Sequence, residues 1–262
     1  MPEIPGRRLG KQEARHDPRT FQFAKYLKPE ALPAPPAKES WTKPVSTWPM
    51  MANDTIGDCT CAAAGHLIEE WTANASTLVV PPTADIIAAY SAITGYNPAD
   101  PSTDRGAVEL DVLNYWRQTG IAGRKIEAFV ALEPQNTEHV KDGVMLFGAV
   151  YIGLALPISA QTQTVWSVPP GGATGQGAPG SWGGHAVPIV GYDHRTLTCV
   201  TWGKLLKMTW GFWHTYCDEA YAILSPDWIK SNHYSPGNFD LATLQADLAQ
   251  LPGAAAAKAG GN

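Results

Sequence analysis

A cysteine stands where the sequence predicts the first turn of a helix. Asp58 is a favourable N-cap residue, and the residues from Cys59 to Ala64 include three alanines, which form helices readily. Unpaired N–H groups and the dipole at a helix N-terminus stabilise an anion, although Asp58 acts weakly against this. We therefore expect the pKa of the Cys59 thiol to fall, which favours the nucleophilic thiolate. The alternative is a small buried side chain without a chemical role.

A histidine follows two glycines at the start of a predicted apolar strand. Gly183 and Gly184 allow close approach of the backbone, and His185 opens the run that ends at Tyr192. A base at a strand start that faces a thiol at a helix start is an arrangement for nucleophilic catalysis across a cleft. The alternative interpretation is a histidine that only caps the strand.

Two further patterns compete for this chemistry. Cys61 is a second thiol in the same turn, and Cys59, Cys61 and His66 resemble a metal clip. Side chains at i and i+2 of a helix diverge and the ligand set is too small, so we expect no metal. His66 and Glu70 are spaced i, i+4, and we expect them to form a surface pair.

Together these segments resemble the papain-like cysteine peptidases over about residues 45–228. The family places an amide six residues, and a glycine two residues, before its nucleophile; Asn53 and Gly57 hold these positions before Cys59. The block from Gly184 to Tyr192 reads Gly-His-Ala-Val followed by Val-Gly-Tyr, as the family's histidine block does. Two Trp-Gly pairs follow, at Trp202-Gly203 and Trp210-Gly211.

The resemblance implies roles for individual residues. Cys59 would be the nucleophile, His185 the base and Asn53 the oxyanion donor, one methylene shorter than the family's Gln. The family's orienting Asn is absent, since Val200 or Thr201 stands there, and only Thr201 can accept from an imidazole. The implied substrate-binding residues are Gly106, Gly183, Gly184, Trp202 and Trp210.

The predicted function is a cysteine-type hydrolase that cleaves peptide or isopeptide bonds through an acyl-enzyme on Cys59, with His185 as its partner and no cofactor. The expected partner is a peptide or protein substrate. Two alternatives remain open. The departures at Asn53 and Thr201 suit a catalytically inactive papain-like binding module, and the same pair suits an acyl transferase or ligase.

The order of predicted elements favours an α+β fold with two lobes. Amphipathic patterns predict helices over about 59–120, and short β-branched runs predict strands from about 125 onwards. The resemblance adds a helical N-terminal lobe, a β-barrel-like C-terminal lobe and a cleft between them. The expected segments are an arm or pro-segment at 1–48, a nucleophile lobe at 49–130, a histidine lobe at 131–238, and a C-terminal helix with a disordered tail at 239–262.

Composition narrows the class of protein. The chain has 262 residues, 44% of them hydrophobic, and a net charge of −5, which disfavours nucleic-acid binding. The longest uncharged apolar stretch, 144–158, is shorter than the ~20 residues of a membrane span. No secretory signal is visible, so we expect a cytoplasmic protein with reduced cysteines. The oligomeric state stays open.

The first 48 residues differ from the rest. They carry nine Lys or Arg against five Asp or Glu, and a Pro33-Ala34-Pro35-Pro36 linker. This segment is interpreted either as a pro-segment or arm that crosses a cleft, or as a leader that lies on the surface. Seven glycines between Pro169 and Gly184 predict a flexible loop, either a lid or a connection.

Overall fold

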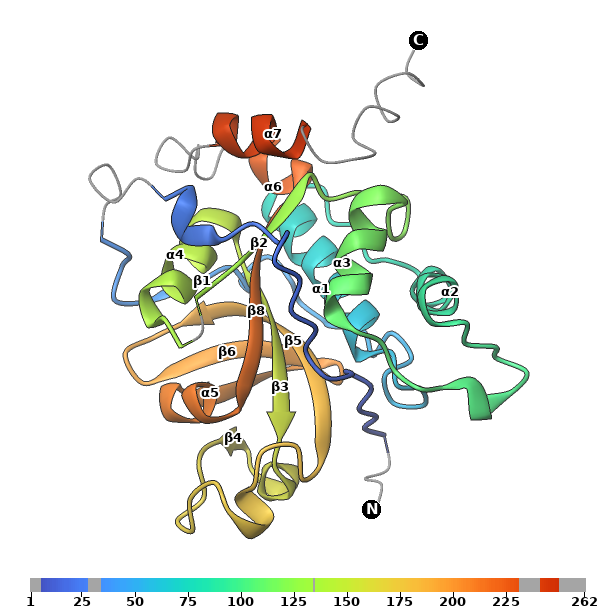
Figure 1. The fold of residues 1–262 in the computed structure, drawn as a ribbon, viewed down its shortest axis with the longest axis vertical. Coiled ribbons are helices and arrows are strands. Elements are labelled where there is room, and N and C mark those ends of the chain that lie inside the picture. The colour runs from blue at the N-terminus through green and yellow to red at the C-terminus, as the bar shows by residue number, and fades with distance from the viewer. Residues whose placement is uncertain (1–5, 28–33, 134, 231–240, 250–262) are drawn as a thin grey trace.

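Three helices form one side of the molecule. The computed structural model describes residues 6–27, 34–133, 135–230 and 241–249. Helix α1 (Cys59–Asn74) packs against α2 (Thr83–Thr94) and α3 (Glu109–Gln118), and the three lie beside the sheet in Figure 1. Gly95 ends α2 in the left-handed conformation, with φ +77°.

The other side is a sheet of eight strands in the order β2-β8-β3-β5-β6-β7-β4, with β1 added to β5. All described pairs are antiparallel except β4 with β7. The strands are β1 (Glu39–Ser40), β2 (Ala128–Ala131), β3 (Val150–Leu156), β4 (Val165–Trp166), β5 (Gly183–Tyr192), β6 (Thr196–Thr201), β7 (Lys204–Thr209) and β8 (Cys217–Leu224).

The remaining helices and turns connect these elements or follow them. They are α4 (Thr137–Phe147), α5 (Trp210–Tyr216), α6 (Pro226–Lys230), α7 (Leu241–Ala249) and the 3-10 turns Phe23–Lys25, Pro101–Thr103, Ile158–Thr162 and Gly175–Gly177. Within the described ranges, no helix is both long and apolar enough to cross a bilayer.

The expected two-lobed α+β fold is confirmed, with local differences from the predicted elements. Asp58 precedes α1 but its side chain makes no capping hydrogen bond. Helix α4 and strand β7 were not predicted, although Asn136 caps α4 by accepting from the His139 N–H. Of the predicted C-terminal segment, the part beyond Ala249, including the tail, lies outside the described residues.

Helix α1 is buried along its whole length, between α2, α3 and the sheet. The expected surface pair is therefore wrong: His66 and Glu70 are only 2% and 0% exposed. His66 Nε2 lies 2.8 Å from the Pro49 carbonyl oxygen, whereas both carboxylate oxygens of Glu70 lack a hydrogen-bond partner. Burial raises the pKa of Glu70 well above its usual range.

This orphaned carboxyl makes stability depend on pH. A carboxyl group whose pKa is raised by folding stabilises the fold below its unfolded pKa, and this contribution is lost as the pH rises. We expect the melting temperature of Glu70→Gln to exceed that of the wild type at pH 8 by more than at pH 4.5. Thermal unfolding at both pH values measures this. The exposed Glu138→Gln is the matched control, and equal pH dependence of the wild type and Glu70→Gln would contradict the expectation.

Candidate active site

Cys59 and His185 come from two elements that pack together. Cys59 is the first residue of α1, and His185 is the third residue of β5, which lies against α1. The backbone N–H of Ala186, directly after the histidine, points at the Cys59 sulfur. Both side chains are buried, each 1% exposed. The fold thus brings the two predicted reactive residues to one place.

The far side of the imidazole is held by the β6–β7 turn. His185 Nε2 lies 2.7 Å from Thr201 Oγ1, and the Trp202 ring stacks on the imidazole with 4.4 Å between centroids. Trp202 has a φ of +44° and is followed by Gly203 at +70°, as a tight hairpin turn requires. His185 Nδ1 has no hydrogen-bond partner, so this nitrogen remains for proton transfer.

The thiol is not activated in this state. Burial raises the pKa of Cys59 to about 12, more than the N–H groups of Ala186 and Gly10 lower it. Burial also lowers the pKa of His185 to about 3. The expected fall in the Cys59 pKa is therefore wrong for the covered site, because desolvation outweighs the helix terminus. Both groups are neutral around pH 7.

The predicted oxyanion donor lies beside the thiol's helix but is turned onto its own loop. Asn53 is 3% exposed, and its Nδ2 donates to the Ile56 carbonyl at 3.2 Å. Its amide also lowers the pKa of the buried Asp58, which burial raises more strongly. Asn53 therefore needs a side-chain rotation before it can donate to a group at Cys59.

The N-terminal arm, residues 6–27, covers this site. Figure 1 shows the arm in dark blue along the boundary between the helices and the sheet. The Gly10 and Lys11 N–H groups donate to the Gly184 carbonyl at 3.3 and 3.1 Å. On the opposite wall, Ala107 N–H donates to Gly10 O at 2.7 Å, and Gln12 N–H donates to Ala107 O at 2.9 Å. The arm therefore lies in a groove as an extended peptide with backbone pairing on both sides.

Glycines allow this close approach. A Cβ on Gly10 would lie 1.7 Å from the Gly57 carbonyl oxygen, and one on Gly106 would lie 2.0 Å from Gly10 O. A Cβ on Gly184 would lie 2.2 Å from Lys11 O, and Trp202 Nε1 donates to Arg8 O at 3.1 Å. The arm thus contacts four of the five predicted substrate-binding residues: Gly106, Gly183, Gly184 and Trp202.

The structure does not bring Trp210 to this site. Trp210 Nε1 donates to the Asp193 carbonyl at 3.0 Å, and its ring lies 6.4 Å from that of Tyr192. These partners lie at the end of β5 opposite to His185. Strand β7 separates the two Trp-Gly pairs and carries the second one away.

The groove wall contains a cluster of carboxylates that the sequence patterns do not predict. Glu109 at the start of α3 and Asp218 and Glu219 in β8 surround the Lys11 ammonium; we call these three residues the acid pocket. Burial lowers the pKa of Lys11, but the three carboxylates outweigh burial and raise it. No sequence spacing links Lys11, Glu109 and the adjacent Asp218 and Glu219, because they come from three distant parts of the chain.

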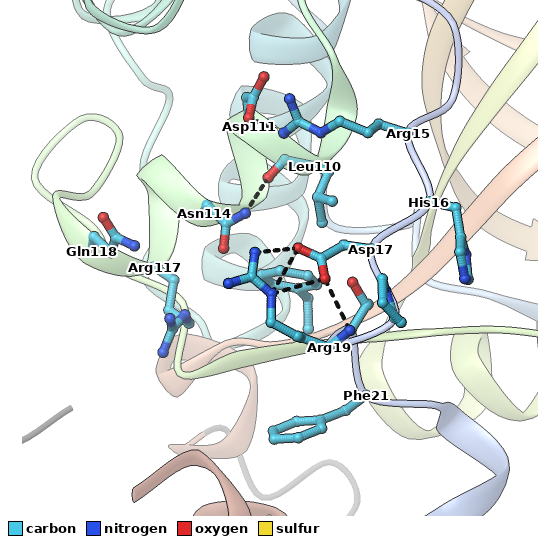
Figure 2. A pocket seen from close by; sticks show the side chains of 13 residues that line it. Arg15, His16, Asp17, Arg19, Phe21, Leu110, Asp111, Asn114, Arg117 and Gln118 are labelled. Atoms are coloured by element: carbon cyan, nitrogen blue, oxygen red, sulfur yellow. Dashed lines mark hydrogen bonds and ion pairs between the residues drawn. The ribbon is translucent and has the colours of Figure 1, made fainter. Parts of the chain in front are cut away.

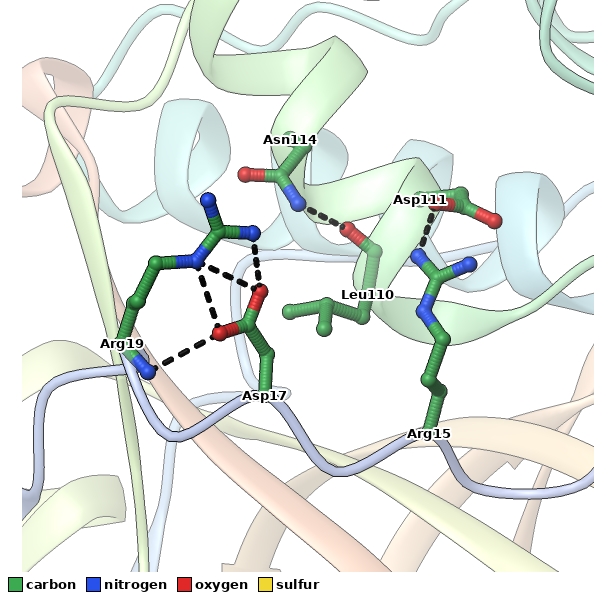
Figure 3. A network of polar contacts seen from close by, with 6 residues as sticks. All are labelled: Arg15, Asp17, Arg19, Leu110, Asp111 and Asn114. Atoms are coloured by element: carbon green, nitrogen blue, oxygen red, sulfur yellow. Dashed lines mark hydrogen bonds and ion pairs between the residues drawn. The ribbon is translucent and has the colours of Figure 1, made fainter. Parts of the chain in front are cut away.

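A larger hollow of about 670 Å³ lies farther along the arm, against α3 (Figure 2). Four of its charged side chains pair locally: Arg15 with Asp111, and Asp17 with Arg19 (Figure 3). The Asn114 side chain donates to the Leu110 carbonyl, four residues earlier in α3. Despite its size, this hollow contains neither the thiol nor the imidazole, so we do not place the chemistry there.

Solved structures with the same fold are cysteine proteases. Xylellain from Xylella fastidiosa matches with a TM-score of 0.67 and 17% identity, over 86% of this chain and 98% of that chain. Procathepsin L 3 of Tenebrio molitor matches at 0.58 and 12%, over 84% and 76%. The protease and lectin-like domains of Clostridium difficile Cwp84 match at 0.56 and 13%, over 80% and 57%. No family model and no curated protein matches the sequence. The chain has the papain-like fold.

Close packing of the arm predicts how fast the thiol reacts. Gly10→Ala places a Cβ against the Gly57 carbonyl, so we expect the arm to lift and Cys59 to be alkylated at least about tenfold faster by iodoacetamide at pH 7.5. Peptide mapping by mass spectrometry follows Cys59 separately from the other three cysteines. Gly171→Ala, where a Cβ meets nothing within 4 Å, is the control. Unchanged alkylation in Gly10→Ala would contradict the arm's role as a cover.

Proposed function

We propose that this protein is a cysteine-type hydrolase that cleaves peptide or isopeptide bonds. The observation that supports this most is the arm, which lies in the groove as an extended peptide with backbone hydrogen bonds on both edges. At the base of this groove, the Cys59 sulfur interacts with the backbone N–H of the residue after His185. The papain-like fold agrees with it. A groove that pairs with peptide backbone suits a peptide substrate.

The reaction begins with proton transfer. Cys59 gives its proton to His185 Nδ1, and the thiolate attacks the substrate's acyl carbon. The Cys59 N–H, which has no intrahelical acceptor in the first turn, and the rotated Asn53 amide donate to the developing oxyanion. His185 returns the proton to the leaving amine, and the carbon–nitrogen bond breaks. Water then attacks the thioester, and a second proton passes through His185 as Cys59 is released.

The arm must leave before a substrate can enter, because its backbone occupies the groove and covers the sulfur. Exposure to water reverses the desolvation that holds both groups neutral, so arm release also activates the thiol. On this proposal residues 6–12 act as a built-in inhibitor.

The assignment of the nucleophile can be tested by labelling. We expect Cys59→Ala to abolish labelling by a thiol-directed epoxide and all peptide hydrolysis, whereas Cys61→Ala retains both. Cys61 is the matched control because it is equally buried, two residues along the same helix. Equal labelling of the two variants would refute the nucleophile. Product analysis with an added amine distinguishes hydrolysis from acyl transfer.

Thr201 is proposed to position the imidazole. Its hydroxyl lies 2.7 Å from Nε2, so Thr201→Val removes that partner at similar volume. We expect kcat to fall about tenfold with little change in KM, which is a fraction of the roughly 10²–10⁴-fold that general acid–base catalysis contributes. We expect Thr201→Ser to restore kcat. The pH profile of kcat/KM should also shift, which loss of packing alone would not cause. A Thr201→Ser variant as slow as Thr201→Val would contradict this role.

A further inference from the structure

The acid pocket shields the Lys11 ammonium from water, although the Asp218 side chain that pairs with it is 34% exposed. Lys11 Nζ lies 2.9 Å from Asp218 Oδ2 and 2.9 Å from Glu219 Oε1, and the lysine side chain is 1% exposed. Nζ also donates to the Gln12 carbonyl at 3.1 Å, while Tyr221 OH donates to Glu219 at 2.9 Å. The pocket therefore binds a basic side chain at its tip.

The pocket also has the shape for a long side chain. Its wall on β3 is Gly153, where a Cβ would lie 2.0 Å from Lys11 Cε and 2.9 Å from Glu109 Oε1. Any other residue at 153 would therefore fill the space that the lysine stem occupies.

The pocket contains more carboxyl groups than one lysine pairs with, and burial raises the pKa of Glu109 well above its usual range. Glu109 is 0% exposed and faces the lysine, yet neither of its carboxylate oxygens has a hydrogen-bond partner. Three carboxylates thus face a single ammonium. A guanidinium, with five donors in a plane, could use acceptors that Lys11 leaves unused.

The position of the pocket relates it to the reactive sulfur. Gly10 lies next to the Cys59 thiol, since its N–H lowers the pKa of that thiol, and Lys11 is the next residue. Ala107 pairs with the backbone on both sides of Lys11. An extended peptide in this groove, with one residue at the sulfur, places a neighbouring side chain in the acid pocket.

We propose that Glu109, Asp218 and Glu219 form a specificity pocket that selects a Lys or Arg side chain of the substrate, next to the residue whose carbonyl is attacked. Lys11 of the arm occupies this pocket in the covered state. The proposal rests on the proposed hydrolase function and adds its substrate class.

Matched peptides test the selection. Each fluorogenic peptide carries lysine, or its uncharged analogue norleucine, either directly before or directly after the residue whose carbonyl is attacked. The wild type and Lys11→Ala are both assayed as full chains. At one of the two positions we expect lysine to raise kcat/KM by about tenfold or more. A tenfold ratio corresponds to about 1.4 kcal/mol of binding free energy. Glu219→Gln should reduce this ratio, whereas the remote Glu138→Gln should leave it unchanged. Equal rates for lysine and norleucine at both positions would overturn the pocket's role and leave the hydrolase intact.

Binding tests the pocket without catalysis. In Cys59→Ala/Lys11→Ala, we expect a dye-labelled lysine peptide to bind about tenfold more tightly than its norleucine twin by fluorescence anisotropy. Should that variant not fold, Lys11→Met keeps the apolar stem and removes only the charge. Tight lysine binding with no hydrolysis in any assay would refute the hydrolase and keep the pocket. Equal dissociation constants for the lysine and norleucine peptides would contradict substrate selection and would mean that the pocket only binds Lys11 of the arm.

Discussion

One buried ammonium connects the two lobes of this molecule. Lys11 meets Glu109 from the helical lobe and Asp218 and Glu219 from the sheet, at the boundary that contains the reactive pair. Breaking a buried ion pair by removing one partner typically costs about 3–5 kcal/mol, since the remaining charges stay buried. The same contact fixes the register of the arm, and with it the residue that covers Cys59.

The covered thiol shows how solvent sets reactivity. A helix N-terminus favours a thiolate, but this effect is smaller than the loss of water around a fully buried sulfur. The imidazole responds in the opposite direction for the same reason, so the two groups resist exchanging a proton while the arm is in place. On the proposed function, the arm therefore controls the reactivity of Cys59 by excluding water, with no change in the catalytic residues themselves.

Sequence patterns predicted what is local and missed what is assembled from distant segments. The helix beginning at Cys59, the strand carrying His185 and the glycines at 183–184 follow from spacing and turn chemistry within short windows. The path of the arm and the acid pocket depend on residues 11, 109 and 218–219. These residues are far apart in the sequence, so no short sequence segment contains them all. The surface expectation for Glu70 failed because α1 is enclosed on every side, which a single helical pattern does not reveal. The Trp210 expectation followed a motif, whereas strand β7 decides where that side chain lies.

The direction of the Gly10 peptide group has a consequence for the arm's own survival. Its N–H donates to the Gly184 carbonyl, while its carbonyl oxygen is held by the Ala107 N–H on the opposite wall. The donors proposed for an oxyanion are the Cys59 N–H and the Asn53 amide, whereas the Gly10 carbonyl oxygen accepts from a different group, the Ala107 N–H. On the proposed function, the arm can therefore stay in the groove without being cleaved after Gly10, because the oxygen of that carbonyl is not held by the donors that would stabilise its attack.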